Sequence, residues 1–355
     1  MQRNEKKAAT VFDVAEKAGV SRGTVDRVIY GRGRFSEASR QRVMEAIAQL
    51  HYTPNANASS LASRKLNLFS VIIPEFKSGD YWDDINKGFL DAARTFSGSN
   101  IDLRVHTYNI LDVDSFVHAC EDVLEEKPDG VILNAIFPEE TIAFALSLEQ
   151  EDTPYAFIDS KIDDLNYTLF YGIDSYKCGK LGAALLTNHL EPKELLLVRV
   201  EFDLIHRVDT NRPRRHGFAD YMEDYHPACH IHTVFIKPEQ PEENIRLLED
   251  FFREHPHVHL MTMTNSRIFL LRDYLRAHPD PKRIVLGFDD LYANMECLRE
   301  GLIDTLVTRH TATQSYKALQ DFATCVIQRK RPTMRNNFVH MDILTPMNVD
   351  NYYNY

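Results

Sequence analysis

The spacing of apolar residues changes at about residue 66 of this chain. Before that point, apolar residues recur at helical intervals in three short stretches, which predicts three short helices. After it, strand-sized apolar runs alternate with amphipathic stretches, which predicts doubly wound parallel sheets with helices on their faces. We therefore expect a small helical domain followed by a larger α/β domain.

The first stretch carries helix start and stop signals at short intervals. Thr10, with Asp13 three residues later, predicts a first helix that ends at Gly19 in the left-handed conformation. Ser21 and Ser36 are expected to cap the second and third helices. The residues predicted to face inward are Phe12, Val14, Ala15, Ala18, Val25, Val28, Ile29, Val43, Ile47 and Leu50. Helices joined in this way form a helix-turn-helix, whose second helix enters the major groove of DNA.

The charge is distributed unevenly along the chain. Residues 1–66 hold 12 Lys and Arg against 6 Asp and Glu, whereas the remainder carries a net charge of −17. A basic block on an acidic protein indicates a polyanionic partner for that block. The apolar runs are too short for a membrane span, no apolar segment follows the first charges, and the five cysteines lack CxxC spacing. We therefore expect a cytoplasmic protein without a disulfide framework or a membrane partner.

A resemblance to the DNA-binding headpiece of the lactose-repressor (LacI-type) family is carried by FDVAEKAGVSRGTVDRVIYGRGRFSEASRQRVMEAIAQLHYTPNANASSLASRK. It implies a homodimer on a palindromic double-stranded DNA operator. Arg22, Gly23 and Arg27 then match the base-reading positions of the family. An arginine side chain at such a position can hydrogen-bond to O6 and N7 of guanine. Asp26 stands where the family usually has serine. Its carboxylate could accept a hydrogen bond from N4 of cytosine, or it could orient Arg27. The DNA contacts that the resemblance implies are Thr10, Ser21, Arg22, Thr24, Arg27, Arg32, Asn55, Ser59 and Leu61.

The stretch TPNANASSLASRK resembles the hinge helix of the same family. Leu61 then matches a leucine that wedges into the minor groove and bends the duplex. On residue pattern alone, Leu61 would be an ordinary linker residue. The expected division is a headpiece at 1–54, a hinge helix or linker at 55–66, and an effector-binding and dimerisation domain at 67–355.

In the acidic part, polar residues that directly follow apolar runs are the first candidates for a ligand site. Parallel α/β sheets bind ligands beyond the carboxyl ends of their strands. The candidates found in this way are Asn134, Asp159, Asn265 and Asp289.

The acidic part also resembles type I periplasmic sugar-binding proteins, in pieces such as VIIPEFKSGDYWDDINKGFLDAA, YGIDSYKCGKLGAALL, NRPRRHGFADYM and RIVLGFDD. The resemblance implies two lobes, at about 67–172 with 311–335 and 173–310 with 336–355. It places Tyr81 and Trp82 where the family has aromatic residues that stack on the ligand. It places Arg212 where the family has an arginine that binds hydroxyls or a carboxylate of the ligand. His310 stands where glutamine is common, and Ser266 where aspartate is frequent. Trp82 could equally belong to a helix core, and Asp289 to a turn.

Other chemistry has weaker support. GVSRG fits a nucleophile elbow, but a predicted helix precedes it where a strand is needed. GIDSYKCGK lacks the spacing of a phosphate loop. HPACHIH and EHPHVH are interpreted as solvated strand-edge histidines rather than a zinc site. We therefore expect no enzyme, metal or cofactor, and predict a regulator of carbohydrate-utilisation genes that senses a sugar or sugar derivative. The alternative is a cytosolic sugar-binding module without a DNA role.

Overall fold

A computed structural model describes residues 9–30, 35–50, 66–96, 101–200 and 211–352. The chain forms two compact units, one within residues 1–65 and the other of residues 66–97 and 101–355. Within the described residues, no helix combines the length and apolar character needed to cross a membrane.

The first unit is a three-helix domain with α1 (Val11–Ala18), α2 (Arg22–Tyr30) and α3 (Glu37–Leu50). The predicted capping box is present: the backbone N–H of Thr10 donates to Asp13 Oδ2 at 2.7 Å, and Gly19 has a φ of +63°. The predicted inward residues meet in one apolar cluster, with one exception. The side chain of Phe12 is 61% exposed, because Val14, Ala15 and Ala18 direct the opposite side of the helix inward.

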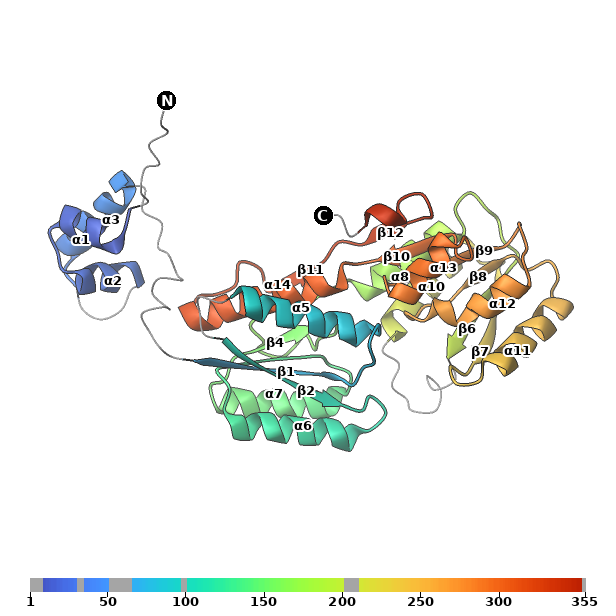
Figure 1. The fold of residues 1–355 in the computed structure, drawn as a ribbon, viewed down its shortest axis with the longest axis horizontal. Coiled ribbons are helices and arrows are strands. Elements are labelled where there is room, and N and C mark those ends of the chain that lie inside the picture. Colours follow the sequence, from blue (N-terminus) through green and yellow to red (C-terminus); the bar gives the residue numbers. More distant parts are fainter. Residues whose placement is uncertain (1–8, 31–34, 51–65, 97–100, 201–210, 353–355) are drawn as a thin grey trace, which may run out of the picture. The chain divides into compact units, whose positions relative to one another are not determined.

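The second unit has two lobes, each with a six-stranded sheet (Figure 1). The first sheet has the strand order β11-β5-β4-β3-β1-β2 and is parallel throughout. Its strands are β1 (Asn67–Pro74), β2 (Ile101–Tyr108), β3 (Gly130–Leu133), β4 (Tyr155–Ile158), β5 (Phe170–Gly172) and β11 (Asn336–Phe338). One face is covered by α5 (Tyr81–Thr95) and α14 (Thr311–Gln328), and the other by α6 (Val113–Glu126) and α7 (Pro138–Gln150).

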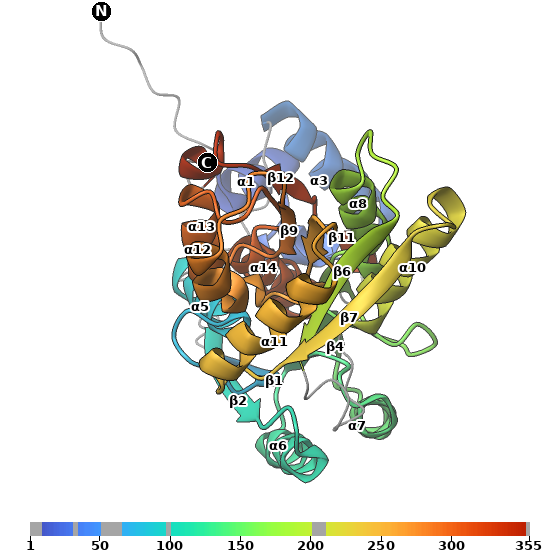
Figure 2. The same ribbon diagram turned by 90° about the vertical axis from the view of Figure 1, so that its right-hand side faces the viewer.

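The second sheet repeats this order as β12-β10-β9-β8-β6-β7, with only β12 antiparallel to its neighbour. Its strands are β6 (Glu194–Val200), β7 (His230–Ile236), β8 (Leu260–Thr262), β9 (Ile284–Phe288), β10 (Thr305–Thr308) and β12 (Asp342–Leu344). One face packs on α8 (Ser175–Leu186) and α10 (Arg212–Tyr225). The other packs on α11 (Pro241–Glu254), α12 (Arg272–Ala277) and α13 (Tyr292–Arg299), with short 3-10 turns at Ile268–Leu271 and Val349–Asn351 (Figure 2). The predicted fold class is confirmed.

The chain passes between the lobes three times, after β5, β10 and β11. The expected lobe boundary at residue 335 lies slightly too early, because β11 at 336–338 still pairs with β5 of the first lobe. The last pass therefore lies between β11 and β12. The two lobes share one strand order, so β4 and β9 occupy corresponding places in their sheets.

Two glycines allow α8 and α10 to pack with their backbones in contact. A Cβ added at Gly179 would lie 1.8 Å from the carbonyl oxygen of Arg214, and one at Gly217 would lie 1.9 Å from that of Tyr176. Neither backbone atom can move away without shifting a whole helix. This contact therefore sets the position of the first turn of α10.

We expect Gly179→Ala to destabilise the second unit by about 1–3 kcal/mol or more, because the added methyl group overpacks the helix pair. Lys177→Ala on the same helix is the matched control; its side chain is exposed, so the change should stay within about 0.5 kcal/mol. Urea unfolding followed by circular dichroism measures both. Equal stability of the two variants would contradict the close helix contact.

Candidate functional site

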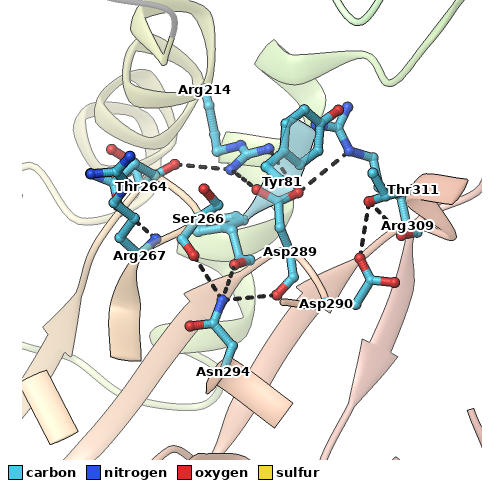
Figure 3. Close-up of polar contacts among 12 residues, drawn as sticks. Tyr81, Arg214, Thr264, Ser266, Arg267, Asp289, Asp290, Asn294, Arg309 and Thr311 are labelled. Atoms are coloured by element: carbon cyan, nitrogen blue, oxygen red, sulfur yellow. Dashed lines mark hydrogen bonds and ion pairs between the residues drawn. The ribbon is translucent and has the colours of Figure 1, made fainter. Parts of the chain in front are cut away.

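A cavity of 160 Å³ lies at the carboxyl ends of the strands and is lined from both lobes. Figure 3 shows several side chains of this lining, among them Tyr81, Asp289 and Arg309. Its polar and aromatic lining consists of Glu75, Asp80, Tyr81, Trp82, Asp159, Ser175, Asn211, Arg214, Asn265, Ser266, Arg267, Asp289 and Arg309. A larger hollow of 430 Å³ lies beside α5 and α13. Its walls include exposed side chains such as Lys87 and Tyr292. Of these two cavities, only the smaller one has several buried charged groups close together in its lining. We therefore take the smaller cavity as the candidate site.

Two aspartates occupy the same place in the two lobes. Asp159 directly follows β4 and Asp289 directly follows β9, and both have a φ of +66°. The backbone N–H of each donates at 2.9 Å to the neighbouring strand, to Tyr171 O and Val307 O respectively. The left-handed region is uncommon for non-glycine residues, although aspartate tolerates it better than most. Such strain is typical of residues whose side chains must be held in one direction at a functional site.

Arg309 joins these two aspartates. It lies between β10 and α14, is 4% exposed, and sets Nη2 at 2.9 Å from Asp159 Oδ1 and Nε at 3.4 Å from Asp289 Oδ1. Its guanidinium also lies over the ring of Tyr81, 4.8 Å from the centroid. Among the described residues, its buried Nη1 has no hydrogen-bond partner. That donor is available to a ligand.

Arg214 approaches Asp289 from the other side, in the first turn of α10. Its Nη1 donates to Asp289 Oδ2 and to Thr264 O, both at 3.0 Å (Figure 3). The guanidinium lies 4.7 Å from the centroid of the Phe288 ring. Asp289 therefore lies between two buried guanidinium groups, one on each side.

Buried Asn294 holds the backbone around Asp289. Its Nδ2 lies 2.9 Å from Ser266 O and 3.0 Å from the carbonyl oxygens of both Phe288 and Asp289 (Figure 3). Its Oδ1 accepts from Phe269 N at 3.0 Å. One amide thus ties the loop after β8 to the end of β9. This supports the left-handed backbone of Asp289.

The charges in the cavity are set by these contacts. Burial raises the pKa of Asp289, but the charges of Arg214 and Arg309 outweigh it and leave that pKa below its usual value. Asp289 is therefore ionised at neutral pH. Burial raises the pKa of Tyr81 well above 10, so its phenol stays neutral and donates to Asp159 Oδ1 at 2.7 Å.

Five of the eight sequence-predicted ligand residues line the cavity: Tyr81, Trp82, Asp159, Asn265 and Asp289. Trp82 also packs on the core of the first lobe, as its alternative interpretation expected; its contact with a ligand stays a prediction.

The other three lie outside the cavity lining. Asn134 is fully buried and accepts from the hydroxyl of Tyr108 at 2.7 Å. His310 lines the larger hollow and stacks on Tyr352 at 4.3 Å. Arg212 is exposed at the start of α10, and Arg214 takes the cavity position instead.

Arg214 and Arg309, the two buried arginines of the cavity lining, were not among the residues predicted from the sequence. The run NRPRR offers three arginines, and only the rotation of α10 decides which one faces inward. Arg309 follows β10, whose four residues TLVT were not identified as a strand. Had that strand been recognised, the same strand-end argument that found Asp159 would have found Arg309.

In the first unit, the predicted base-reading side chains lie at the start of α2. Ser21 Oγ accepts from Thr24 N at 3.2 Å, and Arg27 Nε donates to Gly23 O at 2.9 Å. Arg22 and Arg27 are exposed, whereas the hydroxyl of Thr10 is engaged with Asp13. The predicted contacts Arg32, Asn55, Ser59 and Leu61 lie outside the described residues.

Comparisons with known proteins agree with this two-unit organisation. A sequence profile of bacterial regulatory proteins of the lacI family matches residues 10–55, and one of the periplasmic binding protein domain matches residues 69–326. The HTH-type transcriptional regulator pepR1 of Lactobacillus delbrueckii subsp. lactis is 32% identical over 195 residues, which are 54% of this chain and 56% of that protein. The chain spans about half the length of the curated relatives it matches.

Two solved structures are similar to the second unit. A candidate LacI transcriptional regulator from Bacteroides fragilis is 31% identical with a TM-score of 0.75, over 81% of this chain and 100% of its own. GanP, a glucose-galactose binding protein from Geobacillus stearothermophilus, is 19% identical with a TM-score of 0.66, over 80% of this chain and 99% of its own. The second likeness concerns the fold alone.

Asp290, next to the cavity, is a buried carboxyl with a shifted pKa. Burial and the negative charge of Asp289 raise its pKa to about 7, although the hydroxyl of Thr311 donates to it at 3.0 Å. Between its ordinary pKa and about 7, the folded protein therefore binds a proton that the unfolded chain has released. The contribution of Asp290 to the free energy of unfolding is therefore fully present below that pH window and is lost as the pH rises through it.

Asp290→Asn should remove this pH dependence, because the amide keeps an acceptor for Thr311 and has no charge. We expect the stability of the variant relative to wild type to grow from about pH 4 to about pH 7, by up to roughly 1.4 kcal/mol per pH unit, and then to level off. Urea unfolding at stepped pH measures the difference. A constant difference across this window would show that Asp290 does not titrate there.

Proposed function

Because this chain belongs to the lacI family of bacterial regulatory proteins, we propose that it is a sequence-specific DNA-binding transcription regulator controlled by a small effector. The effector is a sugar or sugar derivative, and the controlled genes serve carbohydrate utilisation. The observation that carries the effector site is the buried cluster of Asp159, Asp289, Arg214 and Arg309 at the strand ends. The protein acts in the cytoplasm, where the DNA is, and the proposal includes no catalytic step.

DNA binding is supported by the charge and shape of the first unit. The net charge of residues 1–66 is +6 on a chain whose total is −11, so phosphate affinity is concentrated there. Arg22 and Arg27 are exposed on α2, the second helix of the helix-turn-helix, where they can reach base edges. The bonds from Arg27 to Gly23 and Thr24 orient its guanidinium; orientation by Asp26 is therefore not required.

The balance of charges in the cavity favours a neutral polar effector. Its lining holds four carboxylates and three guanidinium groups, so a strongly charged ligand would leave several of them unpaired. Hydroxyl groups both donate and accept, and can insert between carboxylates and guanidiniums without a net charge. The rings of Tyr81 and Trp82 can pack against the apolar face of a sugar ring. The volume of 160 Å³ lies below the roughly 300–1,000 Å³ of drug-sized pockets, which favours a small ligand.

Control of DNA binding follows from a site shared by two lobes. A ligand that contacts both Asp159 and Asp289 binds one lobe arrangement better than others, and so shifts the population toward it. In a homodimer, that shift changes the spacing of the two headpieces on a palindromic operator. The hinge segment 55–66, with Leu61 as the proposed minor-groove wedge, would transmit the change.

Arg214 and Arg212 provide a matched pair for testing the effector site. Arg214→Met should weaken effector binding by about 2 kcal/mol, roughly 30-fold, because it removes a buried donor to Asp289. Arg212→Met should change it by less than about 0.5 kcal/mol, because Arg212 is exposed outside the cavity. A thermal-shift screen of pentoses, hexoses and their derivatives identifies a ligand, and calorimetry measures both variants. The reverse order of effects would move the site to Arg212.

Base reading can be tested separately from the effector. We expect Arg22→Ala and Arg27→Ala each to cost about 1–3 kcal/mol on a palindrome selected from random DNA, and to relax specificity at one base pair per half-site. Arg94→Ala, an exposed change in the second unit, is the control. Fluorescence anisotropy at stepped salt measures affinity, which should fall steeply for all variants. Salt-independent binding, or unchanged specificity in both headpiece variants, would refute DNA readout by α2.

A further inference from the structure

Three side chains from distant parts of the second lobe converge at the edge of its sheet. Glu194 begins β6, His232 lies in β7, and His255 directly follows α11. One potential ligand atom from each lies within 4.8 Å of the other two. His232 Nε2 is 2.7 Å from Glu194 Oε2, and His255 Nδ1 is 3.7 Å from the same oxygen.

A further histidine completes the group. His257 Nε2 lies 2.8 Å from Glu194 Oε1, so three imidazole nitrogens surround one carboxylate. Phe251 of α11 stacks on the ring of His255 at 4.7 Å and meets that of His232 edge-on at 5.3 Å. These ring contacts fix the directions of two imidazoles before any ligand arrives.

The arrangement differs from the solvated histidines that the sequence predicted. A histidine on the protein surface commonly pairs with one carboxylate through one hydrogen bond. His278 is such a case, with its Nε2 at 3.0 Å from Glu249 Oε1. Around Glu194, by contrast, three histidines share one carboxylate. The imidazoles of His257 and His232 each approach a different oxygen of that carboxylate, at 2.8 Å and 2.7 Å.

We propose that Glu194, His232, His255 and His257 form a binding site for a divalent transition-metal ion of the zinc class. Zinc takes four nitrogen or oxygen ligands at about 2.0–2.2 Å in a tetrahedron, which places ligand atoms about 3.4 Å apart. One ligand atom each from Glu194, His232 and His255 already lies within 4.8 Å of the other two, so these three need only small side-chain movements to reach that value. His257 approaches the other oxygen of Glu194 at 2.8 Å and can supply the fourth ligand. The set of three imidazoles and one carboxylate suits zinc better than calcium or magnesium, which prefer all-oxygen ligands.

The site lies away from the strand-end cavity. Glu194 is the first residue of β6, whereas the cavity lies beyond the carboxyl ends of the strands. A bound ion would connect β6 and β7 to the end of α11 and the segment that leads into β8. The three core ligands are partly buried and His257 is 58% exposed, so an ion from solution can reach them. The proposal does not depend on the proposed function.

The test uses full-length protein without an affinity tag, and zinc chloride as the probe. Competition with a chromophoric zinc chelator should give about one tight site per chain, and the melting temperature should rise with zinc. His232→Gln and His255→Gln should each weaken zinc binding at least about tenfold and abolish the thermal shift. Cobalt(II) should give the intense visible absorption of a tetrahedral site in wild type and in neither of these two ligand variants.

His278→Gln is the matched control, because it removes a histidine that is paired with a glutamate but not part of the group. Cys229→Ser tests whether the partly exposed thiol is the ligand instead. Both should bind zinc as wild type does. Circular dichroism without metal verifies that each variant folds, and two ligand variants on different elements guard against local misfolding. No tight site in wild type, or zinc affinity unchanged in both ligand variants, would overturn the proposal.

Discussion

The second unit depends on one buried guanidinium, that of Arg309, which contacts an aspartate from each lobe. A charge taken out of water is tolerated only when it is paired, so Arg309 requires Asp159 and Asp289 to remain at 2.9 Å and 3.4 Å. Because the two aspartates follow corresponding strands, the contact favours the arrangement of the two sheets in which both remain paired with Arg309. The contact therefore stabilises one lobe arrangement and also lies where a ligand would bind.

The surroundings of this contact hold it in place through the backbone. The carboxylates are directed by left-handed residues at the ends of β4 and β9, and Asn294 hydrogen-bonds the carbonyls beside Asp289. Arg214 reaches the same carboxylate because Gly179 and Gly217 bring α8 and α10 into backbone contact. Rigid positioning of this kind reduces the entropy cost of binding a small ligand and makes the site selective.

A ligand in this cavity must compete with existing ion pairs rather than fill an empty apolar space. Hydroxyl groups that replace a guanidinium contact on one lobe alter the balance between lobe arrangements. They can also accept a hydrogen bond from Nη1 of Arg309, which has no partner within the described part of the chain. The histidine group at Glu194 occupies the other end of the second sheet. An ion there would stabilise that lobe without touching the effector cavity, so the two sites can act separately.

The sequence by itself determined features that depend on neighbouring residues or on strand ends. Local capping predicted the helix-turn-helix from Thr10, Gly19 and Ser21, and the strand-end argument placed Asp159, Asn265 and Asp289 together. Tertiary structure alone decided the rest. The rotation of α10 selects Arg214 over Arg212, the four-residue strand β10 delivers Arg309, and the pairing of β6 with β7 brings His232 to Glu194. These outcomes depend on helix phase and on contacts between residues far apart in the chain, which local patterns of apolar and polar residues do not contain.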